Sequence, residues 1–232
     1  MQRLVSDAGD GPLVRNAAEA AASVIRRAIL EGRAAPGEPL REEHLASELG
    51  ISRTPIREAL LILQTEGIVD AAPKRGAVVR SYEPDEIADL YETRAVLEGH
   101  AAARAARHIT DAELELLRES CARYASMLTD GDTVSLVQEN RRFHGRLVAA
   151  ARSQSTERLI DAVTRVPLIY RSFHWYSPQE KELGLYYHRR ILHALERRDA
   201  MRAAALMQEH IREALDVLTK QFDSPPPGVR SR

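Results

Sequence analysis

The stretch Ile51-Ser52-Arg53-Thr54-Pro55-Ile56-Arg57-Glu58-Ala59-Leu60 decides the fold of the N-terminal part of this 232-residue chain. Ser52 can cap a helix, and Pro55 falls in its first turn, where a missing N–H costs little. The apolar residues recur at the spacing of an inward helix face: Ile56, Leu60 and Leu63. The polar face carries Arg53, Thr54 and Arg57. The stretch therefore predicts an amphipathic helix with a cationic outer face.

A shorter helix precedes this one over residues 42–49, and Gly50 is its expected C-terminal stop. Two short helices joined by a glycine turn are typical of a helix-turn-helix. Further upstream, residues 17–31 show a helical apolar stripe that ends at Gly32. Prolines and a glycine in residues 35–40 predict a turn.

Downstream of Gly67 the pattern changes from helical to alternating. Residues 71–79 are interpreted as two short strands around the tip Lys74-Arg75-Gly76, which is a wing. Arginines at the start of the second helix would be placed to meet guanine edges or phosphates in the major groove. The alternative from charge alone is a solvated helix face beside an ordinary loop, since any helix surface carries arginine.

The order of these elements resembles the DNA-binding domain of GntR-type regulators. The resemblance rests on four segments: Gly32 to Leu40 with Pro36-Gly37, Leu45-Ala46, Ser52 to Leu60, and Glu66-Gly67. It implies that Arg41, Arg53 and Arg57 contact bases or phosphates of double-stranded DNA, and that Ser52 and Thr54 hold its backbone. It also implies that Gly76 lets the wing tip, with Lys74 and Arg75, enter the minor groove.

Beyond Arg80 every segment has a helical pattern, and no strand signal is present. Thr110-Asp111-Ala112-Glu113 and Ser177-Pro178-Gln179-Glu180 predict capping boxes at two helix starts. The expected helices cover residues 84–106, 110–128, 132–151 and 155–173, one from residue 177, and the last over 199–221. The fold class expected is mainly α: a winged helix-turn-helix of three helices and a small β-wing, followed by an all-α six-helix bundle.

Three histidines of this bundle lie on apolar helix faces. Asn140 and His144 are four residues apart and share one face of a helix, while His188 and His210 each fall within an apolar stripe. A single histidine of this kind is usually a satisfied core residue. Three on inward faces favour a metal site, because neutral imidazole is a common metal ligand and facing helices can converge on an ion.

The bundle resembles the FadR-type C-terminal domain, called FCD, and the two resemblances together cover about residues 15 to 222. The matching residues are Arg94-Ala95-Val96-Leu97-Glu98, Asn140-Arg141-Arg142-Phe143-His144, His188 and His210. In many members of that family an aspartate and three histidines bind a divalent metal such as zinc, nickel or manganese, and a carboxylate effector completes the metal sphere. Asparagine replaces the aspartate at position 140 and brings no negative charge, so we expect weaker affinity for a divalent metal.

Arg94 has two interpretations. It can pair with Glu98 one helical turn away, which on a surface contributes about 0.3 to 0.5 kcal/mol. It can instead anchor a small organic acid, because a guanidinium matches a carboxylate in bidentate geometry. We expect the second role, since Arg94 lies on the same stripe as Leu90 and Leu97.

The expected organisation is a flexible tail over residues 1–14, a winged domain over 15–80, an effector-binding and dimerisation domain over 81–222, and a disordered tail over 223–232. Net charge is −1, so composition alone does not indicate nucleic-acid binding. The sequence has neither a membrane-spanning run nor the order of a signal peptide, so we expect a cytoplasmic protein that does not contact a membrane. The one cysteine, Cys121, is expected to be buried.

The hypothesis is a repressor that binds a near-palindromic operator as a homodimer and loses affinity when a small acid binds. One alternative is a constitutive DNA-binding protein whose bundle serves only for dimerisation. Another is a metal-dependent hydrolase in which His144, His188 and His210 hold zinc and activate water. Against that enzyme, the sequence lacks a His-Glu-x-x-His arrangement.

Overall fold

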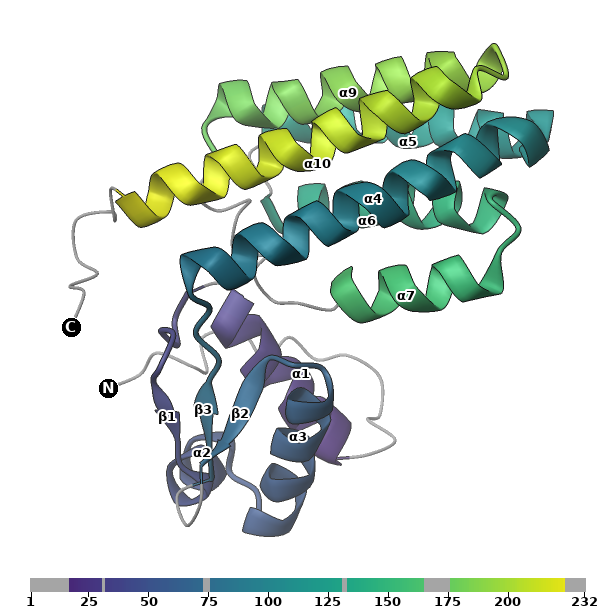
Figure 1. Ribbon diagram of the computed structural model, residues 1–232. Helices are drawn as coiled ribbons and strands as arrows, with labels where there is room; N and C mark the ends of the chain where they lie inside the picture. The colour runs from purple at the N-terminus through teal and green to yellow at the C-terminus, as the bar shows by residue number, and fades with distance from the viewer. Residues whose placement is uncertain (1–16, 31, 73–75, 131–132, 165–175, 224–232) are drawn as a thin grey trace. The chain divides into compact units, whose positions relative to one another are not determined.

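The computed structural model describes residues 17–30, 32–72, 76–130, 133–164 and 176–223 (Figure 1). The predicted tails over 1–14 and 223–232 lie outside these residues, except for Asp223, which is the last residue of the final helix. The chain divides into two compact units, one holding the residues up to Tyr82 and the other most of those from Glu83 onward. The mainly α fold class is confirmed, with one small sheet in the first unit.

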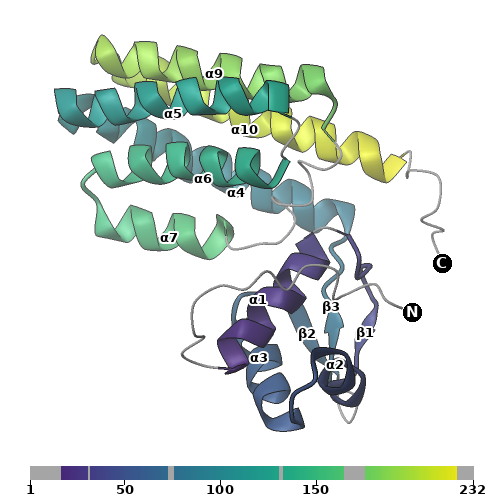
Figure 2. The ribbon, with the colours of Figure 1, turned by 180° about the vertical axis from the view of Figure 1, so that it is seen from behind.

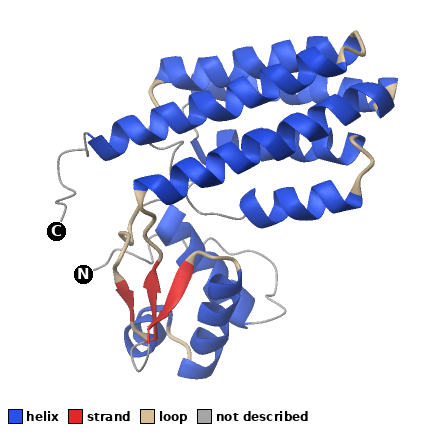
Figure 3. Ribbon diagram, in the orientation of Figure 1, coloured by secondary structure: helices blue, strands red, loops and turns tan. Residues whose placement is uncertain are grey.

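The first unit is a winged helix-turn-helix. Its helices are α1 (Ala17–Leu30), α2 (Glu42–Leu49) and α3 (Arg53–Thr65). Its strands are β1 (Pro39–Leu40), β2 (Val69–Ala72) and β3 (Gly76–Val79), which form an antiparallel sheet in the order β1-β3-β2 (Figure 3). Three helices and a β-wing are thus present as predicted.

Strand β1 corrects the sequence interpretation, which placed only a turn over residues 35–40. Pro39 pairs with Val78 and Leu40 with Ala77. Two residues are too few to show an alternating pattern, and proline argues against a strand except at the edge of a sheet, where β1 lies. The contact partner on β3 is far along the chain, so local sequence could not reveal the strand.

Burial explains why α3 forms where it does. Ile56 and Leu63 are fully buried and Leu60 nearly so, in a core shared with α1, α2 and the sheet. Gly50 ends α2 in the left-handed conformation, as predicted from its sequence position. Ser52 stands at the N-cap of α3 with extended backbone, but its side chain makes no capping hydrogen bond, which corrects the predicted cap.

The second unit holds six described helices: α4 (Pro84–His108), α5 (Asp111–Asp130), α6 (Thr133–Ala150), α7 (Gln154–Thr164), α9 (Pro178–Glu196) and α10 (Ala200–Asp223). The predicted capping boxes at Thr110 and Ser177 are both present. Helix α7 begins one residue earlier than predicted, and the predicted continuation over 165–173 lies outside the described residues. The described part of this unit contains no strand.

Small residues bring the helices of the bundle close together. Helix α10 packs along α4, and α5 lies between α6 and α9 (Figure 2). At Gly99 of α4 a side chain of α10 lies very close, because a Cβ there would lie 2.7 Å from Cγ of Gln208. None of the described helices is long and apolar enough to cross a membrane. Cys121 is buried, as predicted.

Candidate DNA-reading face and candidate metal centre

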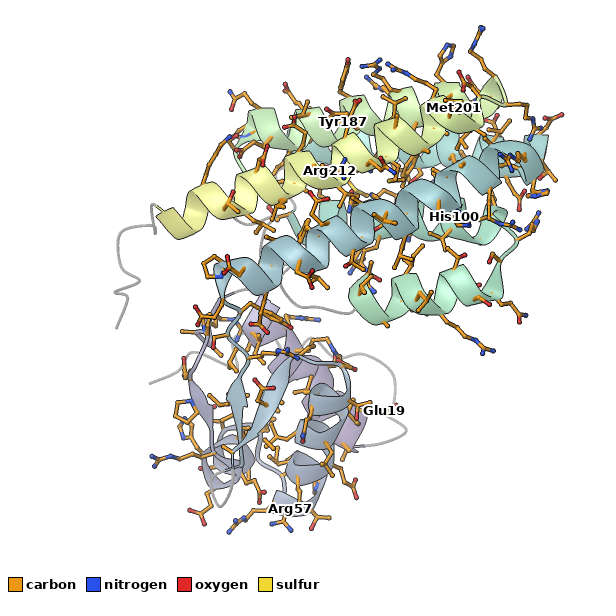
Figure 4. All side chains as sticks on the ribbon, viewed as in Figure 1. Glu19, Arg57, His100, Tyr187, Met201 and Arg212 are labelled. Carbon is orange, nitrogen blue, oxygen red and sulfur yellow. The ribbon has the colours of Figure 1, made fainter. Side chains whose placement is uncertain are left out.

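The outer face of α3 exposes the two arginines that the sequence singled out. The side chains of Arg53 and Arg57 are 56% and 67% exposed, and Arg57 projects from its unit in Figure 4. Together with α2 and the wing they line a groove of about 670 Å³, whose lining includes Arg41 and Gly76. Ser52 and Thr54 are exposed at the start of α3. The predicted Lys74 and Arg75 lie outside the described residues.

The same groove contains two carboxylates that sequence reasoning did not assign. Glu42 accepts hydrogen bonds from Nε and Nη2 of Arg57, each at 3.1 Å, and one from Nη2 of Arg53 at 3.4 Å. Glu43 accepts one from Nη1 of Arg53 at 2.8 Å. The hydrogen bond from Arg57 lowers the pKa of Glu42, and the same bond raises the pKa of Arg57. The arginines are therefore oriented by acidic partners.

Gly76 has a structural role in addition to the one that the resemblance implies. Its φ is +92°, and a Cβ there would lie 2.4 Å from the carbonyl oxygen of Leu40. Only glycine lets β3 begin so close to the end of β1. Packing of the sheet alone therefore accounts for glycine at this position.

The three predicted histidines meet inside the helical unit, each from a different helix. His144 comes from α6, His188 from α9 and His210 from α10, and their candidate ligand atoms all lie within 4.8 Å of one another. Nε2 of His144 faces Nε2 of His210 at 3.2 Å. All three are buried or nearly buried. The three histidines, which the sequence analysis assigned to three separate helices, are thus close together in the structure.

His188 differs from the other two histidines in the hydrogen bonding of its ring within the described structure. Both of its ring nitrogens are buried and have no hydrogen-bond partner there. Its ring stacks on Phe143 with centroids 3.9 Å apart and meets the edge of Tyr124. Burial, followed by the neighbouring His210 and His144, lowers the pKa of His188 well below its usual value. A buried polar group of this kind requires an explanation, and a bound ion is one.

His188 and His210 have the ionisation state that metal binding requires. Burial, with His144 next in effect, lowers the pKa of His210 to about 3, so this ring is neutral near pH 7. Metals bind the neutral imidazole through its lone pair. Two facing Nε2 atoms and one unpartnered ring are therefore a donor set that fits a divalent ion of intermediate softness.

Glu98 orients His144 through a contact to Nδ1 of its ring, a role that the sequence analysis missed. Its Oε2 lies 2.6 Å from Nδ1 of His144, and Oε1 accepts from Nε of Arg94 at 3.0 Å. Burial opposes ionisation of Glu98, but the charge of Arg94 and the hydrogen bonds from Arg94 and His144 outweigh it, so the pKa of Glu98 falls to about 2. A carboxylate behind a histidine fixes the tautomer in which Nε2 is free to bind a metal. The signal available in sequence was the Arg94–Glu98 spacing on an inward stripe.

Arg94 forms the ion pair that was its alternative interpretation, in a buried form. Its side chain is 6% exposed, and its Nη2 also lies 3.0 Å from Oε1 of Glu98. These contacts use Nε and Nη2. The remaining predicted ligand, Asn140, is buried on α6 one turn before His144.

A winged helix-turn-helix with arginines on its outer helix, followed by a helical domain around a buried polar cluster, defines a DNA-binding transcriptional regulator. Comparison with known families agrees. Residues 17–79 match the bacterial regulatory proteins of the gntR family, and residues 89–213 match the FCD domain.

Named relatives are regulators as well. The Nta operon transcriptional regulator of Aminobacter aminovorans is 32% identical over 204 residues, covering 82% of this chain and 94% of the relative. The HTH-type transcriptional repressor RspR of Escherichia coli K12 is 29% identical, covering 82% of this chain and 83% of the relative. The structure of E. coli McbR/YncC has a TM-score of 0.74 at 22% identity, covering 90% of this chain and all of that one.

The chain therefore belongs to the GntR family of bacterial transcriptional regulators and carries a C-terminal FCD domain. The matched families and named relatives are DNA-binding regulators and not enzymes. The metal-dependent hydrolase considered from the three histidines is therefore rejected.

Proposed function

We propose that this regulator is a repressor whose affinity for its operator is controlled by a small carboxylate, bound together with a divalent metal in the FCD domain. The observation that carries the proposal is His188, a fully buried imidazole with two unpartnered nitrogens beside His144 and His210. The repressor assignment draws on one relative, RspR, which is named a repressor.

His144, His188 and His210 would hold the metal, with Asn140 as a further ligand through its amide oxygen. A bound zinc, nickel or manganese ion would supply a positive charge that attracts an anionic ligand. A carboxylate at position 140 would neutralise part of the metal's charge, but this chain has asparagine there. The four side chains therefore carry no negative charge. We therefore expect modest metal affinity in the absence of an acid.

Arg94 would contact the carboxylate of the effector. Its contacts to Glu98 use Nε and Nη2, which leaves Nη1 for a ligand oxygen. A guanidinium that is already held by a buried partner loses little conformational freedom when it binds a carboxylate. The effector would thus bind to an Arg94 side chain that Glu98 already holds in place.

On DNA, Arg41, Arg53 and Arg57 would read or hold the operator, with Ser52, Thr54 and the wing residues Lys74, Arg75 and Gly76 at its backbone and minor groove. One small winged domain reads a short site, so a homodimer on a near-palindrome is the expected arrangement. For the acid to change operator affinity it must bind the two states of the regulator unequally.

The test is a panel of small carboxylic acids against the melting temperature of the purified protein, each with zinc, nickel, manganese or chelator. A ligand at about 100 times its dissociation constant stabilises by about 2.7 kcal/mol, which raises the melting temperature by a few degrees. We expect one acid to do so only with metal. His188→Leu should abolish that rise, whereas His100→Ala, at an exposed histidine of α4, should preserve it (Figure 4).

Two outcomes would overturn parts of the proposal. If no acid stabilises the protein under any metal condition, the FCD domain serves dimerisation and the regulator binds DNA constitutively. A DNA duplex enriched from a random library with the wild-type protein tests the DNA-binding part. If Arg53→Ala with Arg57→Ala leaves binding to that duplex unchanged, α3 does not read the operator.

A further inference from the structure

Arg53 and Arg57 are both held by carboxylates, but through different edges of their guanidinium groups. Arg57 donates to Glu42 through Nε and Nη2. Arg53 donates through Nη1 to Glu43 and through Nη2 to Glu42. A guanidinium has five N–H groups in a fixed plane, so the edge that faces a carboxylate decides which edge remains for another partner.

For Arg57, the edge that remains is one that can recognise guanine. The outer edge, formed by Nη1 and the second N–H of Nη2, points away from Glu42. Bidentate recognition of guanine places two parallel donors on O6 and N7 of the base. Arg57 can therefore meet a guanine while it keeps both bonds to Glu42.

For Arg53, the outer edge is already occupied. Any contact of that edge with DNA must first displace Glu43, whose side chain is 78% exposed. An exposed ion pair of this kind is weak and easily exchanged for a phosphate. Glu43 therefore competes with DNA for the outer edge of Arg53, whereas Glu42 leaves the outer edge of Arg57 open to DNA.

Glu42 is also the better anchored of the two carboxylates. Its side chain is only 15% exposed, and it is the first residue of α2, where a helix N-terminus stabilises negative charge. Two arginines share it. Glu42 is thus a fixed support that limits the rotation of Arg57.

We propose that Glu42 is a specificity-determining positioning residue, which holds Arg57 with its outer edge toward a guanine of the operator and penalises random DNA by placing a carboxylate near its phosphates. Glu43 only lowers the affinity for DNA in general. The proposal rests on the proposed role of Arg57 in reading the operator.

Glu42→Gln and Glu43→Gln form a matched pair, since each removes one negative charge from the same turn of α2. A randomised duplex library is first enriched with the wild-type protein, and dissociation constants are then measured for an enriched duplex and a scrambled one. Both variants should bind the scrambled duplex more tightly. Only Glu42→Gln should lose preference for the enriched duplex, by about tenfold, the effect of one bidentate arginine–guanine contact. Glu43→Gln should keep that ratio within about twofold, as for a sequence-independent charge change.

A second measurement tests the geometry. Replacing guanine by 7-deazaguanine in the enriched duplex removes the N7 acceptor. Wild type and Glu43→Gln should lose affinity by about tenfold at one position, and Glu42→Gln should lose much less there. Equal losses in all three proteins would overturn the proposal. Melting curves of each variant establish that it is folded.

Arg57→Ala separates failure of this proposal from failure of the assignment on which it rests. If Arg57→Ala removes the guanine preference but Glu42→Gln keeps it, Arg57 reads DNA without help from Glu42. If Arg57→Ala keeps the preference, Arg57 does not read the operator, and the role proposed for Glu42 fails together with the role proposed for Arg57.

Discussion

Glu98→Gln should destabilise the helical domain strongly, because it removes the counter-charge of a buried arginine. Glu98 is 1% exposed and Arg94 5%. Removing one partner of a buried pair costs about 3 to 5 kcal/mol, since the other charge stays buried and uncompensated. The pKa leads to a similar magnitude. A fall from the ordinary value of 4.5 to about 2 corresponds to about 3 kcal/mol of stability at pH 7.

The sign of the pH dependence follows from the direction of that shift. A carboxyl whose pKa is lowered by folding stabilises the protein fully above its unfolded pKa and loses that contribution as pH falls. The stability gap between wild type and Glu98→Gln should therefore be constant above about pH 5 and shrink from there toward pH 2.

Urea unfolding of chelator-treated protein, followed by circular dichroism at several pH values, measures this gap. Glu92→Gln is the matched control, because Glu92 also lies on α4 and also pairs with an arginine, Arg212, but at the surface. It should cause a much smaller loss. Equal losses in the two variants, or a gap that persists unchanged at pH 3, would refute the assignment of Glu98 as a buried ionised partner of Arg94.

Three further changes are predicted. Gly76→Ala should lower the free energy of unfolding of the winged domain by about 2 to 4 kcal/mol in calorimetry, because a Cβ at φ +92° would meet the Leu40 carbonyl. Gly145→Ala, in open space within α6, should instead raise stability by about 0.5 to 1 kcal/mol. His188→Leu should raise the stability of metal-free protein by about 1 kcal/mol, because it removes two unpartnered buried nitrogens; a lower urea midpoint would contradict this. The Cys121 thiol, whose pKa burial raises to about 11, should react with a thiol reagent at pH 8 only at the rate of unfolding.

Features that depend on residues close together in the chain could be predicted from the sequence. The span of α2 with its glycine stop, the inward residues of α3 and two capping boxes all depend on spacings of three or four positions. Helix periodicity and cap chemistry determine such features locally. The three inward histidines were found in the same way, since each shares a face with apolar neighbours.

Contacts between distant segments could not be predicted. Strand β1 exists because β3 lies beside it, and Glu42 meets Arg57 across 15 positions. Glu98 reaches His144 across 46 positions. At each glutamate the sequence shows only an acidic residue on a helix, which is usually solvated. Tertiary packing, and not local pattern, selects these two as partners of the candidate site residues Arg57 and His144.

Glu42 and Glu98 each orient a neighbouring side chain, one at the surface and one in the interior. Added salt should therefore affect them differently. Each contacts a side chain for which we propose a binding role: Arg57 on α3 and His144 on α6. The bonds of Glu42 lie at the surface, where ions screen charge within about 10 Å at 0.1 M, so added salt should free Arg57 and weaken sequence preference along with affinity. Glu98 is sealed from solvent, so the orientation of His144 should be insensitive to salt. Varying ionic strength should therefore change the proposed recognition of the operator by Arg57 and leave the orientation of His144 unchanged.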